Sequence, residues 1–138
     1  FTKEQDGQAE EAMKFYTSIF TDSEIGTNMN NEGKISYADF RLFNQWFAVM
    51  DGGPQHKFSF NPAISLIVSC KDQKEIDYYW EKLSANPKFE QCGWLQDKYD
   101  VSWQITPANI EELMKTPGAF KRMMQMKKID IAKLQKSH

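Results

Sequence analysis

The strongest constraint on this chain is a helical pattern that occurs twice. Apolar and aromatic side chains follow the i, i+3, i+4, i+7 spacing of one helical face in Gln8–Phe20 and again in Gln73–Ala85. The two faces consist of Ala12, Phe15, Tyr16 and Ile19, and of Ile76, Tyr79, Trp80 and Leu83. Strand patterns follow each helix, which indicates an internal duplication. One such half could not cover its own sheet, whereas two placed together can.

Each half is predicted to have the order β-α-β-β-β, with the opening strand of the first half almost absent. The fold class is therefore α+β, with two βαβββ modules and helices at the C-terminal end. A change of phase within the strand Lys34–Phe43 predicts a bulge near Ala38–Asp39. Asp72 with Glu75 three residues later resembles a capping box, which begins the second helix. The other predicted strands are Glu24–Asn30, Trp46–Met50, Ala63–Cys70, Gln91–Leu95 and Val101–Thr106.

The length of 138 residues suits a single compact domain that contains both modules. We expect module one in residues 1–54, a loop in 55–62, module two in 63–107 and a helical segment in 108–138. Within the last segment, Thr116-Pro117-Gly118 separates two helical stretches. The basic tail Lys127–His138 is predicted to form a solvated helix end.

Two strands of the second module place hydrogen-bonding groups on one face. In Val101–Thr106 the side chains of Val101, Trp103 and Ile105 alternate with those of Ser102, Gln104 and Thr106. In Ala63–Cys70 the two serines, Ser65 and Ser69, share one parity. Because successive side chains of a strand point to opposite faces, one face packs on a helix and the other carries small polar groups. A sheet of this kind suggests a lined cavity.

Charge and composition exclude several classes of partner. The formal net charge of −2 gives no reason to expect binding of nucleic acid or of an acidic membrane surface. No stretch reaches the ~20 apolar residues that a membrane-spanning helix needs, and no cleavable signal peptide is evident. Cys70 and Cys92 both lie in apolar runs, so we expect buried thiols in a reducing cytoplasm.

Strings distributed over nearly the whole chain resemble one protein family. They include Gly7–Ala12 with Phe15-Tyr16, Asp51–Pro54, Asn61–Ser65, Asp72-Gln73 with Tyr78–Trp80, Gln91–Asp97, Val101–Ile105 and Met126–Asp130. Together they are similar to the PhnB-like branch, often labelled as a 3-demethylubiquinone-9 3-methyltransferase domain. This branch belongs to the vicinal oxygen chelate superfamily, which includes the glyoxalases and the bleomycin-resistance proteins.

The resemblance implies a barrel-like cup, usually completed in a homodimer, in which most of the superfamily holds a divalent metal. The histidine ligand of the family's second module falls on Ser65, and the glutamate ligand of its final strand falls on Gln104. A further ligand falls within Ala48–Met50, and the first would lie on the truncated opening strand. A hydroxyl and a neutral amide are poor substitutes for imidazole and carboxylate, so we expect neither a metal nor another cofactor.

The sequence thus predicts a cytoplasmic, dimeric, small-molecule-binding protein of this branch, with no ligand named. The aromatic walls of the predicted binding site are Trp46, Phe60 and Trp94. Its polar floor consists of Ser65 and Gln104, and two loop residues, Asp51 and His56, are expected close to the ligand.

Three enzymatic alternatives remain open. A metal-free enzyme would use Asp51 or His56 as its acid–base group. A metal-dependent enzyme would take its ligands from other positions. The methyltransferase activity in the family label is the third, although no G-x-G-x-x-G fingerprint for a nucleotide-type methyl donor is present. Met123, Met124 and Met126 form either an adaptable binding stripe or simple packing.

Overall fold

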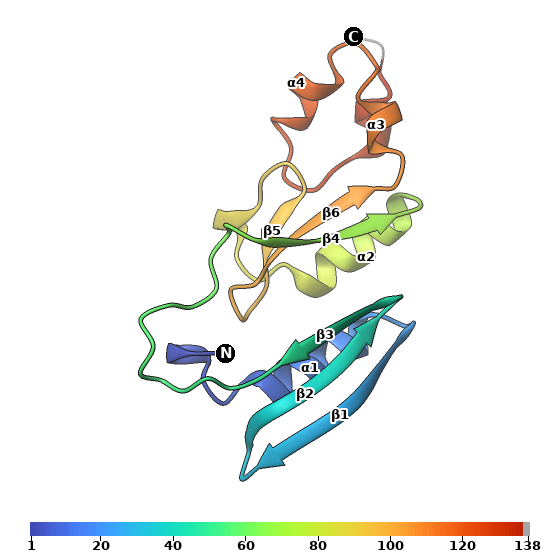
Figure 1. Cartoon of the computed structure of the whole chain (residues 1–138). Helices are drawn as coiled ribbons and strands as arrows, with labels where there is room; N and C mark the ends of the chain where they lie inside the picture. Colours follow the sequence, from blue (N-terminus) through green and yellow to red (C-terminus); the bar gives the residue numbers. More distant parts are fainter. Residues whose placement is uncertain (137–138) are drawn as a thin grey trace. The chain divides into compact units, whose positions relative to one another are not determined.

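The computed structural model describes residues 1–136, and the last two residues of the basic tail lie outside the described residues. The chain forms two compact units, residues 1–60 and residues 61–138. Each unit contains a three-stranded sheet and helices (Figure 1). The predicted α+β class and the recurring order of helix followed by strands are confirmed. In the described part of the chain each unit has three strands. In the first unit, only an isolated bridge from Thr2 to Gly53 represents the predicted opening strand.

The first unit packs helix α1 (Ala9–Ile19) against an antiparallel sheet. The sheet has the order β1-β2-β3, with strands β1 (Ser23–Asn31), β2 (Lys34–Leu42) and β3 (Gln45–Val49), and a 3₁₀ helix η1 (Lys3–Gln5) precedes α1. The predicted helical face is buried, except that Phe15 is half-buried. It meets the inner face of β2, where the Tyr16 and Phe40 rings stack with centroids 6.2 Å apart. The apolar face of α1 therefore covers one side of this sheet.

The phase change in β2 results from an extra residue at Ser36, slightly before the predicted position. In the register Met29 lies opposite Tyr37 and Asn30 lies opposite Ile35, so no residue of β1 lies opposite Ser36. The extra residue turns Ile35 and the following apolar residues Ala38, Phe40 and Leu42 to the same buried face. A second irregularity, in β1, lies opposite Asp39.

The second unit has the order β4-β6-β5, with β4 (Ser65–Cys70) parallel and β5 (Trp94–Gln96) antiparallel to β6 (Ser102–Pro107). Helix α2 (Gln73–Leu83) begins at the predicted cap, because the Asp72 carboxylate accepts the Glu75 backbone N–H at 2.9 Å. Its predicted face is buried against one side of the sheet, except that Trp80 is half-buried, and η2 (Pro87–Phe89) follows. The core residues between α2 and the sheet are Val68, Cys70, Ile76, Tyr79, Leu83, Leu95, Trp103 and Ile105.

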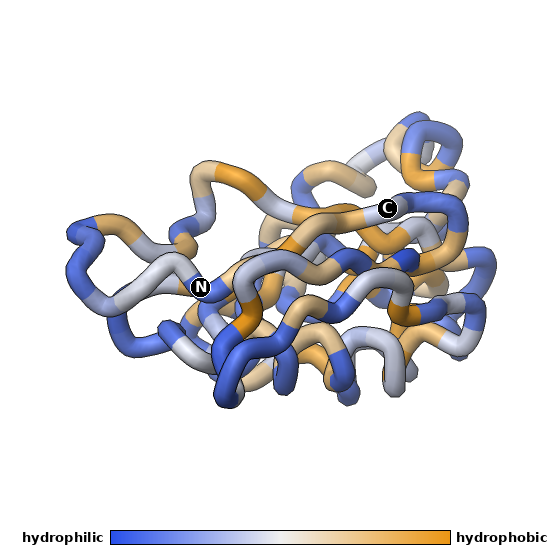
Figure 2. Tube along the Cα trace, turned by 60° about the horizontal axis from the view of Figure 1, so that its bottom comes forward, coloured by the Kyte–Doolittle hydropathy of each residue, from blue (hydrophilic) through white to orange (hydrophobic). Residues whose placement is uncertain are grey.

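The C-terminal segment folds into three short helices, α3 (Ile110–Leu113), α4 (Ala119–Met123) and α5 (Ile131–Leu134). The prediction of a solvated tail holds for its described lysines, which are exposed, but Ile129 and Leu134 are fully buried in a cluster with Leu113. The Arg122 guanidinium holds α4 to α5 by donating to the Lys133 and Leu134 carbonyls at 2.8 and 3.1 Å. Along the chain as a whole, short hydrophobic stretches alternate with hydrophilic ones (Figure 2).

Membrane-spanning helices are not found among residues 1–136, where no helix combines the length and the apolar character that a bilayer requires.

Candidate functional site

The second unit contains a pocket between the open face of its sheet and the C-terminal segment. Its volume is about 760 Å³, which lies in the range of small-molecule sites. The sheet contributes one wall and the segment after β6 the other. The lining residues are Ile67, Ser69, Gln91, Cys92, Trp94, Gln104, Thr106, Pro107, Ala108, Ile110, Met123, Met124 and Ile129.

The alternation of side chains in β4 and β6 creates the wall formed by the sheet. Trp103 and Ile105 point to the α2 side and are buried, so Gln104 and Thr106 point to the other side and line the pocket. Ser69 is the register partner of Thr106, which places two hydroxyl groups side by side on this face. The polar face expected from the sequence therefore exists, although Ile67 interrupts it with an exposed apolar side chain.

Gln104 also contacts Ser65 on the neighbouring strand. Its Nε2 donates to the Ser65 Oγ at 2.9 Å, in a partly buried position. The Ser102 hydroxyl, on the same face of β6, is buried and has no hydrogen-bond partner among the described residues. The polar groups of this face are thus neutral hydroxyl and amide groups.

A divalent metal, as the family resemblance implies, does not fit these residues. The two positions that would supply imidazole and carboxylate carry a hydroxyl and an amide, which bond to each other. Among residues 1–136, no group of three His, Cys, Asp or Glu side chains is placed to hold a metal ion. Ala48, Val49 and Met50 of the first unit offer no oxygen or nitrogen side-chain ligand.

The second wall depends on a close contact at Gly93. Its φ is +87°, and a Cβ at this position would lie 2.9 Å from Ile129 Cδ1 and 3.1 Å from the Ile105 carbonyl oxygen. The Cys92 and Gly93 N–H groups donate to the Met126 and Lys127 carbonyls, both at 2.8 Å. These bonds bring the C-terminal segment over the hairpin, so Met123, Met124 and Ile129 reach the pocket.

The two cysteines differ in their surroundings, contrary to the expectation that both are buried. Both are free, and Cys70 is buried whereas Cys92 is half-buried and lines the pocket. Burial raises the pKa of the Cys70 thiol to about 12, with a further contribution from Glu75 and Asp72. The Cys92 sulfur lies 3.7 Å from the Met124 sulfur.

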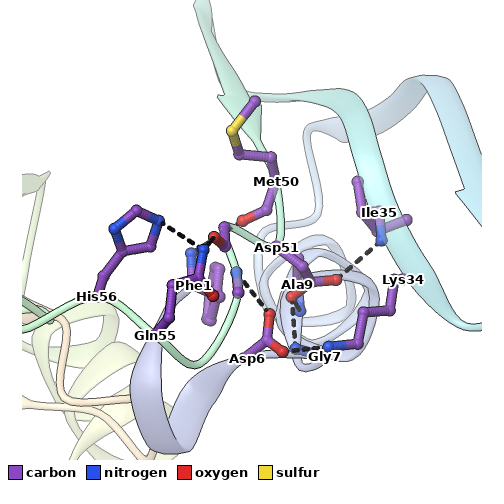
Figure 3. A network of polar contacts seen from close by, with 12 residues as sticks. Phe1, Asp6, Gly7, Ala9, Lys34, Ile35, Met50, Asp51, Gln55 and His56 are labelled. Atoms are coloured by element: carbon purple, nitrogen blue, oxygen red, sulfur yellow. Dashed lines mark hydrogen bonds and ion pairs between the residues drawn. The ribbon is translucent and has the colours of Figure 1, made fainter.

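Asp51, predicted near the ligand, serves as a backbone anchor within the first unit (Figure 3). Its Oδ1 accepts the Gly7 and Ala9 N–H groups at 2.8 and 3.1 Å, and its Oδ2 accepts the Ile35 N–H at 2.8 Å. Asp51 thereby connects the start of α1 to β2.

Asp6, close to Asp51 in Figure 3, forms an ion pair with Lys34 and accepts the Gly53 N–H at 2.9 Å. The Lys34 ammonium holds the pKa of the Asp6 carboxyl below its usual value.

The other predicted residues of the first unit lie in its loop and on its third strand. The His56 ring contacts the Phe58 ring with centroids 4.8 Å apart, and Phe60 makes an edge contact with Phe1 at 5.0 Å. Trp46 on β3 is half exposed.

Of the predicted ligand contacts, the structure brings together Trp94 and Gln104 in the pocket and Ser65 next to Gln104. Trp46, Asp51, His56 and Phe60 belong to the first unit, and their part in binding stays a prediction. Sequence reasoning did not select Ile67, Thr106 or Ile129 as contacts, although the parity of the strands already placed Thr106 on the polar face.

Comparison with known proteins gives one family. Residues 3–106 match the family model described as 3-demethylubiquinone-9 3-methyltransferase. A solved structure, a putative 3-demethylubiquinone-9 3-methyltransferase, PhnB protein, from Bacillus cereus, is 39% identical, with a TM-score of 0.66, over 78% of this chain and 95% of the other.

A structure of a protein from Staphylococcus aureus is 30% identical over 78% of this chain and 92% of the other, with a TM-score of 0.33. No curated protein matches the chain.

Proposed function

This chain belongs to the 3-demethylubiquinone-9 3-methyltransferase family of PhnB-like proteins, and from this premise we propose that it binds a small molecule in the pocket of its second unit. The observation that carries the proposal is the pocket of about 760 Å³, with apolar and sulfur-containing side chains on its walls and a few amide and hydroxyl groups. Small-molecule sites are commonly concave and mostly apolar, with a few polar groups that fix the orientation of the ligand.

Binding in this proposal needs no metal ion. The Gln104 amide donates to the Ser65 hydroxyl at 2.9 Å, and neither group has the charge or the basicity of the carboxylate and imidazole ligands that bind transition metals. The amide would instead act as a hydrogen-bonding group toward the ligand. Trp94, its register partner on β5, would supply the aromatic wall.

The resemblance to the vicinal oxygen chelate superfamily supports further parts of the proposal. We propose that the protein is a cytoplasmic homodimer whose modules, residues 1–54 and 63–107, are joined by the loop 55–62 and followed by the helical segment 108–138.

A second candidate is methyl transfer, the activity for which both the family and the Bacillus cereus protein are named. The reaction would move a methyl group from a sulfonium donor to a phenolic oxygen of a quinol precursor and release one proton. Incubation with a labelled sulfonium donor and such a precursor tests it. Labelled methyl ether as the product would favour this candidate over binding alone.

Native mass spectrometry of protein purified gently from cells tests the main proposal, together with elemental analysis of the same sample. We expect a retained small molecule, no stoichiometric metal and a dimer mass. The Trp94→Ala variant should lose the retained molecule, while the Trp46→Ala variant controls for the removal of an indole outside the pocket. Stoichiometric Zn, Ni, Mn or Fe would contradict the metal-free proposal.

A further inference from the structure

The lining of the second-unit pocket contains no charged side chain among its thirteen residues, all of which lie in the described part of the chain. From this we infer that the pocket selects uncharged aromatic molecules over anions and cations of the same shape. The inference deepens the proposed function and rests on it. A charged group that leaves water must find a countercharge or dense hydrogen bonding, and this lining supplies no countercharge.

Two lysines close to the lining in sequence, Lys127 and Lys128, are committed to other contacts. The Lys127 ammonium donates to the Pro87 carbonyl at 3.3 Å and lies 3.8 Å from a Glu90 carboxylate oxygen. Lys128 forms an ion pair with Asp77 at 2.8 Å. These cations are therefore neutralised on the side of η2 and α2.

Arg122, on the helix that carries Met123, is also engaged. Its guanidinium donates to the carbonyls of Pro117, Lys133 and Leu134 at 2.8 to 3.2 Å. Its positive charge thus serves to hold α4 and α5 together, and an anionic ligand would have to displace these bonds to recruit it.

The polar groups of the pocket are neutral and few. Gln91 uses its Nε2 to donate to the Met124 carbonyl at 2.8 Å, so this amide holds the second wall in place. Gln104 bonds to Ser65 through one end of its amide, which leaves the other end for a ligand. Ser69 and Thr106 add hydroxyl groups on the same face. Such groups match a single neutral N–H, hydroxyl or carbonyl group of a ligand.

The remaining walls favour a flat, polarisable body. Trp94 offers an aromatic ring, and aromatic pairs gain energy beyond the area that they bury. Cys92, Met123 and Met124 bring three sulfur atoms to the same pocket. Thioether sulfurs make favourable contacts with aromatic rings, and unbranched methionine side chains adapt to the outline of the ring. The ligand class that fits both the shape and the charge is a neutral aromatic compound.

Matched pairs of probes test the inference. Phenylnaphthylamine is neutral, and anilinonaphthalene sulfonate has the same ring system with an added negative charge. Fluorescence titration of the full chain should show phenylnaphthylamine binding at least about tenfold more tightly, the factor that 1.4 kcal/mol represents. In competition experiments, neutral naphthylmethanol should likewise displace phenylnaphthylamine at lower concentration than the cation naphthylmethylammonium does. The Trp94→Ala substitution should weaken the binding of phenylnaphthylamine, and this loss would locate the probe in the second-unit pocket.

The Gln104→Glu variant introduces a carboxylate of almost the same shape. We expect it to bind naphthylmethylammonium about tenfold more tightly than the wild type does, because the carboxylate supplies the missing countercharge. Gln45→Glu, an exposed position on β3, controls for the change in net charge. Circular dichroism verifies that each variant is folded.

Failure of the inference and failure of the proposed function give different results. Equal or tighter binding of the sulfonate than of phenylnaphthylamine, with both weakened by Trp94→Ala, would overturn the charge selection and leave the binding function standing. Absence of binding by all four probes to folded wild-type protein would overturn both.

Discussion

The Gln104 side-chain amide donates a hydrogen bond to the Ser65 hydroxyl across the parallel strands β6 and β4, with 2.9 Å between Nε2 and Oγ. The resemblance to the vicinal oxygen chelate superfamily implies metal ligands at these two positions. In this protein the two side chains form a hydrogen bond with each other, and this bond fixes the orientation of the Gln104 amide at the edge of the pocket.

Removing one partner of this bond should have a measurable cost. We expect Ser65→Ala to lower the free energy of unfolding by about 0.5–1.5 kcal/mol, because the partly buried amide loses its partner. A double-mutant cycle with Gln104→Ala, measured by urea denaturation, isolates the coupling between the two side chains. Ser69→Ala, on the same strand, serves as the control. A coupling energy of zero would show that the bond does not form in solution.

Trp94 and His56 should differ in their effect on binding. Trp94→Ala should lower the affinity for phenylnaphthylamine by about tenfold to a hundredfold, since a buried aromatic contact contributes about 1.5–3 kcal/mol. His56→Ala should leave the affinity unchanged within about twofold, because its ring packs on Phe58 in the loop of the first unit. Fluorescence titration of both variants provides the comparison. The reverse order of effects would move the binding site to the loop.

Asp51 should be essential for stability rather than for chemistry. Asp51→Asn keeps the shape of the side chain but turns one acceptor into an N–H₂ group, which then faces a backbone N–H donor. Since a hydrogen bond to a charged group contributes about 1.5–3 kcal/mol, we expect a loss of this size in the free energy of unfolding. Thermal and urea denaturation measure it. If Asp51→Asn keeps full stability but abolishes an activity, the acid–base alternative gains support.

Alkaline pH should destabilise the second unit through Cys70. Its pKa is about 12 in the folded chain against 9.0 for the free thiol, so the thiol ionises more easily when unfolded. The stabilising contribution of the protonated Cys70 thiol to the free energy of unfolding is complete below pH 9 and is lost as the pH rises from 9 toward 12. Burial also raises the pKa of Tyr79 to about 12, so this residue adds a further loss of stability above pH 10.

Comparison of Cys70→Ala with the wild type isolates the contribution of the thiol. The variant should lose less stability than the wild type between pH 7 and about pH 11 in urea denaturation. Cys92→Ala, at a half-buried position, controls for the removal of a sulfhydryl group as such. Parallel curves for Cys70→Ala and the wild type would mean that the Cys70 thiol is not shielded from solvent.

The sequence was sufficient for features that depend on neighbouring residues. The spacing of Ile76, Tyr79 and Leu83 identified the buried face of α2, and Asp72 with Glu75 identified its first turn. Alternation identified the polar face that includes Gln104. Each of these signals arises within one element, where the helical or strand period alone decides which side chains point the same way.

Residues that meet only through long-range contacts were harder to predict. The basic residues after Lys127 suggested a solvated tail, yet Ile129 and Leu134 are buried. The close approach at Gly93 depends on Ile129, which is distant in sequence. Local charge could not reveal this contact, because the apolar side chains within the basic segment find their partners only after the chain folds back.

By itself the sequence determined the family, the α+β class, the two helices with their buried faces and the neutral character of Ser65 and Gln104. Only the tertiary structure decided that these two side chains bond to each other, that Asp51 is an anchor, and that Met123 and Ile129 close a pocket over the sheet. The physical reason is that periodicity and composition are properties of the chain, whereas a pocket is the space between segments that packing alone brings together.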